Sequence, residues 1–189
     1  MSEYLNADLL DKAVTEKKKL KYDKVIFLDI DGVMHNYSGD EIVQEERVKR
    51  LQRIVNATGA KLVLSSSWRF GYSQFLEENN LMEYADPNES ESLKYFETIL
   101  KKYDLEIMTF TPYSTLGENG RPLEIRRFLL DKPNVKSFVI LDDDDFNWQW
   151  LKAFLVQTRR TTENGSDRLG LEEEDVTKAI EILNQFDET

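Results

Sequence analysis

The strongest indication of the fold is the segment Val25-Ile26-Phe27-Leu28-Asp29-Ile30-Asp31-Gly32-Val33, an apolar run that ends in two carboxylates and a glycine. Four consecutive apolar residues are typical of a buried parallel strand. Residues i and i+2 of an extended segment share a face, so we expect Asp29 and Asp31 to project together beyond the strand. Open α/β sheets bind ligands just outside the carboxyl ends of their strands. From this motif alone, a turn or helix cap is an equal alternative, and an EF-hand loop is a weaker one because the motif follows a strand.

Composition restricts the chemistry that is open to the chain. Its 189 residues suit one domain with a substantial core. The absence of cysteine excludes disulfides, thiolate nucleophiles and cysteine-bound metals, and the single histidine, His35, excludes a histidine-rich metal site. The net charge of -11 argues against non-specific binding of nucleic acid. The sequence has no secretory signal and no apolar stretch of membrane-spanning length, so we expect a cytoplasmic protein without membrane contact. No protein partner can be inferred.

Apolar spacing predicts strands that alternate with helices. The predicted strands cover residues 24–29, 61–65, 105–110, 137–141 and 155–157. The predicted helices cover residues 5–20, 41–57, 72–82, 90–103 and 121–130, followed by a short aromatic helix around Trp148 and a last helix around residues 176–183. This alternation indicates an α/β fold with three Rossmann-like layers, in which helices cover both faces of a mostly parallel central sheet. We expect a helical extension over residues 1–23, packed on a single domain over residues 24–189.

Three of the predicted strands end in polar residues. These are Asp29 and Asp31, then Ser65-Ser66-Ser67, then Asp142 and Asp143. Because the ends of parallel strands share one edge of the sheet, four carboxylates would gather there, and each close pair would repel by about 4 kcal/mol at an effective dielectric constant near 20. A bound cation relieves this repulsion. Oxygen ligands without cysteine or histidine favour Mg²⁺.

These motifs resemble those of the haloacid dehalogenase (HAD) superfamily of aspartate-nucleophile phosphatases. They occur in the superfamily's order, as Asp29-Ile30-Asp31-Gly32-Val33, Ser65, Arg121 at a predicted helix start, and Asp142-Asp143. A closer resemblance is to the small HAD domains grouped with Swiss army knife RNA-repair proteins. It rests on Leu64-Ser65-Ser66-Ser67-Trp68-Arg69, Arg121-x-x-Glu124-Ile125, Ile140-Leu141-Asp142-Asp143-Asp144, and a similar tail at Val156-Gln157-Thr158 and Gly170-Leu171. The loop Arg159–Leu169 looks longer and more polar than in that group, so its substrate contacts are not carried over.

The resemblance implies a role for each motif, and the chemistry of the side chains agrees. Asp29 is expected to attack phosphorus and form an aspartyl-phosphate, and Asp31 to act as general acid and base. Ser65 and Arg121 are expected to contact the phosphoryl group, although the superfamily more often has lysine at the position of Arg121. Mg²⁺ is expected to bind Asp29, the main-chain carbonyl of Asp31, and Asp143. The sequence leaves Asp142 either as a second ligand or as the partner of Arg121.

Several neighbouring residues have two interpretations. Ser66 and Arg69 are candidate substrate-binding residues, with a surface ion pair as the alternative for Arg69. Trp68 is more typical of a core residue than of a stacking platform. His35 is more typical of a partly exposed loop histidine than of a leaving-group contact.

The sequence therefore predicts a Mg²⁺-dependent phosphomonoesterase with an aspartyl-phosphate intermediate. The segments between the motifs leave no room for a large cap domain, so we expect an open site and a phosphorylated substrate such as a nucleic-acid end or a nucleotide. A catalytically weak phospho-ligand-binding or regulatory module is one alternative, and a phosphotransferase is the other.

Overall fold

The computed structural model describes residues 23–35, 43–85, 91–114, 120–158 and 170–185. The predicted helix at residues 5–20 lies outside these ranges. The proposed extension over residues 1–23 also lies outside them, except for its last residue, Asp23. The loop Arg159–Leu169 also lies outside them. In the part of the chain that is described, no helix is both long enough and apolar enough to cross a membrane.

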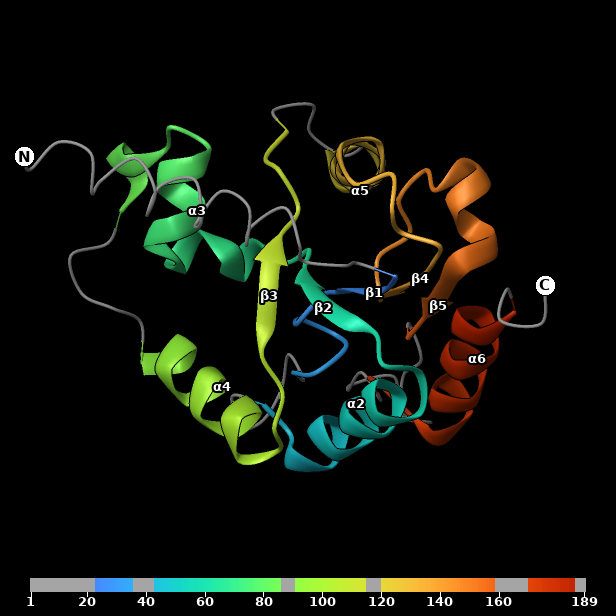
Figure 1. The fold of residues 1–189 in the computed structure, drawn as a ribbon. Helices are drawn as coiled ribbons and strands as arrows, with labels where there is room; N and C mark the ends of the chain where they lie inside the picture. Colours follow the sequence, from blue (N-terminus) through green and yellow to red (C-terminus); the bar gives the residue numbers. More distant parts are fainter. Residues whose placement is uncertain (1–22, 36–42, 86–90, 115–119, 159–169, 186–189) are drawn as a thin grey trace, which may run out of the picture.

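A five-stranded sheet forms the centre of the molecule (Figure 1). Its strands are β1 (Lys24–Leu28), β2 (Lys61–Leu64), β3 (Ile107–Phe110), β4 (Ser137–Asp142) and β5 (Leu155–Gln157). They lie in the order β3-β2-β1-β4-β5, and every neighbouring pair is parallel. The predicted α/β fold with a parallel sheet is confirmed.

The register of the three central strands brings their carboxyl ends to one level. Leu28, at the end of β1, pairs with Leu64 of β2 and Leu141 of β4. The ladder continues one residue further, because the amide of Asp29 donates to Leu141 and the amide of Ser65 donates to Leu28. The polar residues that follow these strands therefore begin side by side.

Helices cover both faces of the sheet (Figure 1). Even-numbered residues of β1, Ile26 and Leu28, belong to the core cluster that includes α2 (Glu45–Thr58), α4 (Glu91–Lys102) and α6 (Glu173–Asn184). Odd-numbered residues, Val25 and Phe27, pack in the cluster that includes α5 (Gly120–Asp131) and the 3₁₀ helix η4 (Gln149–Phe154). Each fully buried aliphatic or aromatic side chain contributes about 1.5–3 kcal/mol of hydrophobic free energy. Burial on both faces explains the continuous apolar run of β1.

The short helices after β2 differ most from expectation. They are η1 (Ser67–Gly71), α3 (Ser73–Glu78) and η2 (Met82–Tyr84), whereas the sequence predicts one helix over residues 72–82. Asn79 interrupts that helix because its side-chain amide donates to the carbonyl of Phe75, and Asn80 follows with φ of 58°. Asparagine tolerates this left-handed conformation better than most residues. Helix α2, by contrast, ends close to its predicted limit, with Gly59 at φ of 68° as its cap.

Candidate active site

Three aspartates meet at the carboxyl edge of the sheet. Asp29, Asp142 and Asp143 each offer a carboxylate oxygen, and these oxygens lie within 4.8 Å of one another. All three residues are buried, with exposed fractions of 3% or less. This cluster unites the first and fourth sequence motifs.

Arg121 joins two of these carboxylates. Its Nη1 donates to Oδ2 of Asp29 at 2.9 Å and to Oδ2 of Asp142 at 2.7 Å. It is the second residue of α5, so the predicted position at a helix start is confirmed. Burial opposes its charge, but the two aspartates outweigh burial and raise the pKa of Arg121. A permanently charged guanidinium therefore lies beside the predicted nucleophile.

Burial makes the carboxylates costly to ionise. It raises the pKa of Asp29 to about 6, although the charge of Arg121 acts in the opposite direction. Burial, followed by the charge of Asp29, raises the pKa of Asp142 well above its usual range. The Ser66 hydroxyl also lowers the pKa of Asp29, but Oδ1 of Asp29 has no hydrogen bond in good geometry to any described residue. One oxygen of the predicted nucleophile is therefore held by Arg121, and the other is buried and has no hydrogen bond in good geometry to the described residues.

Gly32 allows Asp143 to approach the first motif. A Cβ atom at Gly32 would lie 2.2 Å from Oδ2 of Asp143, and φ of Gly32 is 72°. The hydroxyl of Thr158 donates to the carbonyl of Gly32, and the amide of Thr158 donates to the carbonyl of Asp142. Thr158 thus ties the first motif to the fourth.

The second motif contributes a buried hydroxyl. Ser65 is 1% exposed, and its Oγ makes no hydrogen bond to the described residues. The neighbouring Ser66 has a structural contact, because its hydroxyl accepts a hydrogen bond from the amide of Trp68 at 3.4 Å. An unsatisfied buried hydroxyl is costly unless a ligand pairs with it. Ser65 therefore suits contact with a phosphoryl oxygen.

Asp31 has different surroundings from Asp29. The strand ends at Leu28, so the side-chain alternation of an extended segment does not continue through Asp31. Its Oδ2 accepts a hydrogen bond from Nε1 of Trp68 at 3.1 Å, and its Oδ1 lies 3.3 Å from Nδ1 of His35. The side chain of Asp31 is 31% exposed and is not among the three clustered carboxylates. The contact from Trp68 is not among the sequence-based predictions, and the signal for it is an aromatic residue with a polar N–H shortly after the serines of the second motif.

Arg69 takes part in an ion pair, but a buried one. Its Nη2 lies 2.7 Å from Oε1 of Glu124, and its Nη1 donates to the hydroxyl of Thr111. The amide of Ser114 donates to the same Glu124 oxygen. The alternative prediction of an ion pair is confirmed, but its placement at the surface is wrong, because Arg69 is only 5% exposed. Direct contact of Arg69 with substrate stays a prediction.

Comparison with protein families identifies the chain. Residues 25–176 match the family described as the HAD domain in Swiss Army Knife RNA repair proteins. The chain belongs to this family. No curated protein and no solved structure gives a match. The matched range includes all four motifs and the sheet that carries them, except for Lys24 at the start of β1.

The donors in this HAD domain fit a hard cation. Both oxygens of Asp142 already have partners, since Oδ2 accepts from Arg121 and Oδ1 accepts from the amide of Asp144. Asp142 therefore contacts Arg121, as one of its two expected roles requires, and its role as a second metal ligand stays a prediction. The carboxylates of Asp29 and Asp143 are the other donors in this cluster, and together they suit Mg²⁺, which binds few protein carboxylates.

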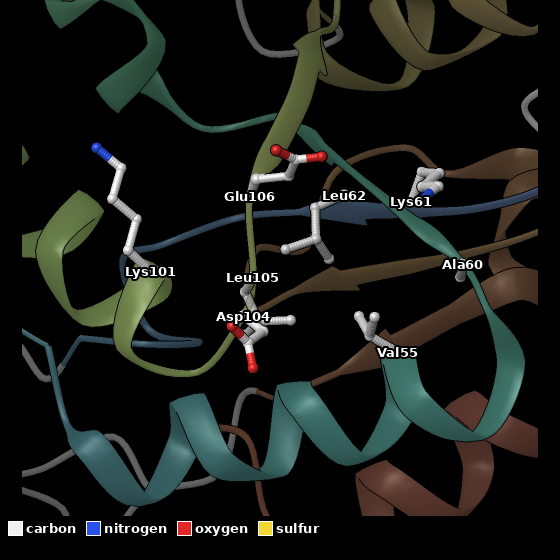
Figure 2. Close-up of a pocket in the computed structure, with 8 residues that line it drawn as sticks. All are labelled: Val55, Ala60, Lys61, Leu62, Lys101, Asp104, Leu105 and Glu106. Carbon is white, nitrogen blue, oxygen red and sulfur yellow. The ribbon is translucent and has the colours of Figure 1, made fainter. Parts of the chain in front are cut away.

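A separate cavity of about 470 Å³ lies at the amino ends of the parallel strands, opposite the aspartate cluster. Figure 2 shows its lining, with Lys61 and Leu62 at the start of β2, Val55 from α2 and Lys101 from α4. The acidic Asp104 and Glu106 also line it. Because Ser65 follows the far end of β2, this cavity is not part of the HAD site.

Proposed function

We propose that this HAD domain is a Mg²⁺-dependent phosphomonoesterase that works through an aspartyl-phosphate. The main support is that Arg121 holds Oδ2 of the buried Asp29, while Asp31 is oriented separately by Trp68 and His35. The two aspartates thus have environments suited to different roles. Asp29 is a fixed nucleophile beside a positive charge, and Asp31 is a partly exposed group that can exchange protons.

In the first step, Oδ1 of Asp29 attacks phosphorus. A bond forms between this oxygen and phosphorus while the bond from phosphorus to the leaving oxygen breaks. Asp31 gives its proton to the leaving oxygen, which departs as an alcohol. Arg121 and Ser65 stabilise the negative charge on the phosphoryl oxygens.

In the second step, a water molecule attacks the aspartyl-phosphate. Its proton passes to Asp31, which is now a carboxylate, and the bond between phosphorus and Asp29 breaks. Inorganic phosphate leaves, and Asp29 and Asp31 return to their starting states. General acid-base help of this kind contributes about 10²- to 10⁴-fold in rate.

Asp29, Asp143 and the main-chain carbonyl of Asp31 would hold Mg²⁺, which would supply positive charge that neutralises the phosphate and the clustered carboxylates. Asp142 keeps Arg121 in place beside this group.

Phosphorylated nucleic-acid ends or nucleotides are the proposed substrates. The family to which the chain belongs is described by its occurrence in RNA repair proteins. The described residues between β1 and β2 form α2, which packs in the core, and those between β2 and β3 form short helices and α4. These parts include no separate cap domain, which favours a substrate larger than a small metabolite.

The test compares wild type with Asp29→Asn on an aryl phosphate, with and without Mg²⁺. Asp104→Asn is the matched control, because Asp104 is exposed at the opposite edge of the sheet and its left-handed backbone suits asparagine. We expect Mg²⁺-dependent turnover for wild type and the control, and loss of turnover for Asp29→Asn. Equal turnover by wild type and Asp29→Asn would refute the mechanism. RNA and DNA ends phosphorylated at the 5′, 3′ and 2′ positions, compared with nucleotides, then define the substrate.

A further inference from the structure

We propose that Trp68 is a positioning residue that orients the general acid Asp31 through its indole N–H. The inference rests on the phosphatase mechanism proposed above. It gives a function to a residue whose side chain would otherwise be assigned to the core.

The contact is directional. Nε1 of Trp68 donates to Oδ2 of Asp31 at 3.1 Å. An indole N–H can donate but cannot accept, so Oδ2 remains an acceptor whether Asp31 is protonated or ionised. The proton that Asp31 transfers is then carried by Oδ1. The contact therefore selects which oxygen faces the leaving group.

The ring of Trp68 is itself fixed. Its ring packs edge to face on Phe96, with 5.9 Å between the ring centres, and it contacts the core cluster that includes α2, α4 and α6. The hydroxyl of Ser66 accepts from the amide of Trp68 at the start of η1. Because packing and the Ser66 contact already fix the ring, its N–H points at Asp31 before substrate binds. Little side-chain freedom is therefore lost on binding.

A backbone turn of the first motif fixes the main chain next to Asp31. Oδ1 of Asp31 lies 3.3 Å from Nδ1 of His35, and the turn between them is closed by a hydrogen bond from the amide of Gly32 to the carbonyl of His35. The amide of His35 donates in turn to the carbonyl of Ile30. Asp31 is therefore held between a turn of the first motif and the helix η1 of the second.

The hydrogen bond between Trp68 and Asp31 connects the second motif to the first. Ser65, which suits the phosphoryl oxygen, lies three residues before Trp68. The short segment from Ser65 to Trp68 therefore positions the hydroxyl that suits the phosphoryl group and also orients the acid Asp31. Correct orientation of Asp31 assists protonation of the leaving oxygen of the substrate. The effect on the rate should be larger for poor leaving groups, because these need a proton in order to depart.

The first experiment compares leaving groups in Trp68→Phe. Phenylalanine keeps an aromatic ring in the core but removes the N–H. With saturating Mg²⁺, we expect kcat/KM for an alkyl phosphate to fall roughly 10-fold, a part of the full general-acid contribution. Formation of the aspartyl-phosphate from dinitrophenyl phosphate, whose leaving group needs no proton, should change less than about 2-fold. Trp150→Phe is the matched control, because Trp150 is 51% exposed on η4.

The second experiment is a double-mutant cycle with Asp31→Asn, measured as phosphoryl transfer from dinitrophenyl phosphate and from an alkyl phosphate. If Trp68 acts through Asp31, Trp68→Phe will have no further effect on either substrate in the Asp31→Asn background. An equal loss on both substrates, or the same loss with and without Asp31, would overturn the inference. Failure of the proposed function would give a different result, namely equal turnover by wild type and Asp29→Asn.

Discussion

Gly32 determines how closely the proposed metal ligand Asp143 can approach the first motif. Gly32→Ala would force a methyl group to within 2.2 Å of the Asp143 carboxylate. Gly59 is a matched control, since it has a similar φ of 68° but no atom within 4 Å of an added Cβ. We expect Gly59→Ala to lower the free energy of unfolding by about 1–2 kcal/mol through backbone strain. Gly32→Ala should lose about 1–3 kcal/mol more through overpacking and should bind Mg²⁺ more weakly. Chemical denaturation and calorimetric titration measure both, and equal losses in the two variants would contradict this role of Gly32.

The raised pKa of Asp29 predicts a pH dependence of stability. In the folded protein without metal, burial raises the pKa from 3.8 to about 6, so the folded state binds this proton more tightly than the unfolded state does. The stability that the proton provides is lost as pH rises from about 4 to 6, and it is absent above the folded-state pKa. Because Asp29→Asn removes this titration, its melting temperature relative to wild type should increase from pH 5 to pH 8 in the presence of chelator. Added Mg²⁺ should stabilise wild type more at pH 8 than at pH 5. A difference between the two proteins that does not vary with pH would contradict the assigned burial effect.

The short helix η1 is connected to α5 by one buried ion pair. Arg69 of η1 contacts Glu124 of α5, and Glu124 also accepts from the amide of Ser114. Breaking one side of a buried pair leaves an uncompensated charge, which costs about 3–5 kcal/mol. We therefore expect Glu124→Gln to lower the free energy of unfolding by about 3 kcal/mol. Arg69→Met with Glu124→Gln should recover part of that loss, as measured by denaturation with urea. If the double variant is less stable than Glu124→Gln alone, the buried charge is not the cause.

Local patterns predicted most elements because each has a strong periodic or capping signal. The apolar runs that end at Leu28 and Leu141 identify two central strands, and Gly59 marks the end of α2. The length of α3 was predicted less well, because the side chain of Asn79 ends the helix within an otherwise helical pattern. Strand alternation also could not be extended to Asp31, because β1 ends three residues earlier.

The sequence predicts the candidate site as a set of motifs, with only one pairing, Asp142 with Arg121, among its stated alternatives. The shared strand ends bring Asp29, Asp142 and Asp143 together, as expected for a parallel sheet. Which partner each aspartate has depends on side chains from distant segments. Arg121 reaches Asp142 from α5, and Trp68 reaches Asp31 from η1. These contacts require the helices to be placed on the sheet, and no spacing in the sequence gives that placement.

The net charge of the whole molecule predicts how salt affects long substrates. A chain with a charge of -11 repels a nucleic acid at low ionic strength. Because salt screens this repulsion, kcat/KM for an end-phosphorylated oligonucleotide should rise relative to that for a mononucleotide between roughly 20 and 200 mM salt. Steady-state assays with both substrates at constant Mg²⁺ measure this ratio. A steep fall with salt would indicate instead that basic residues contact the phosphate backbone directly.

The proposed chemistry depends on covalent transfer of phosphate to Asp29. The most direct measurement uses radiolabelled dinitrophenyl phosphate, whose leaving group needs no proton from Asp31, with acid quenching during turnover and peptide mapping of the labelled protein. The proposed mechanism predicts Mg²⁺-dependent label on Asp29, a higher labelled fraction in Asp31→Asn because the second step lacks its base, and no label in Asp29→Asn. Hydrolysis by Asp29→Asn at the wild-type rate, or label on another residue, would contradict it.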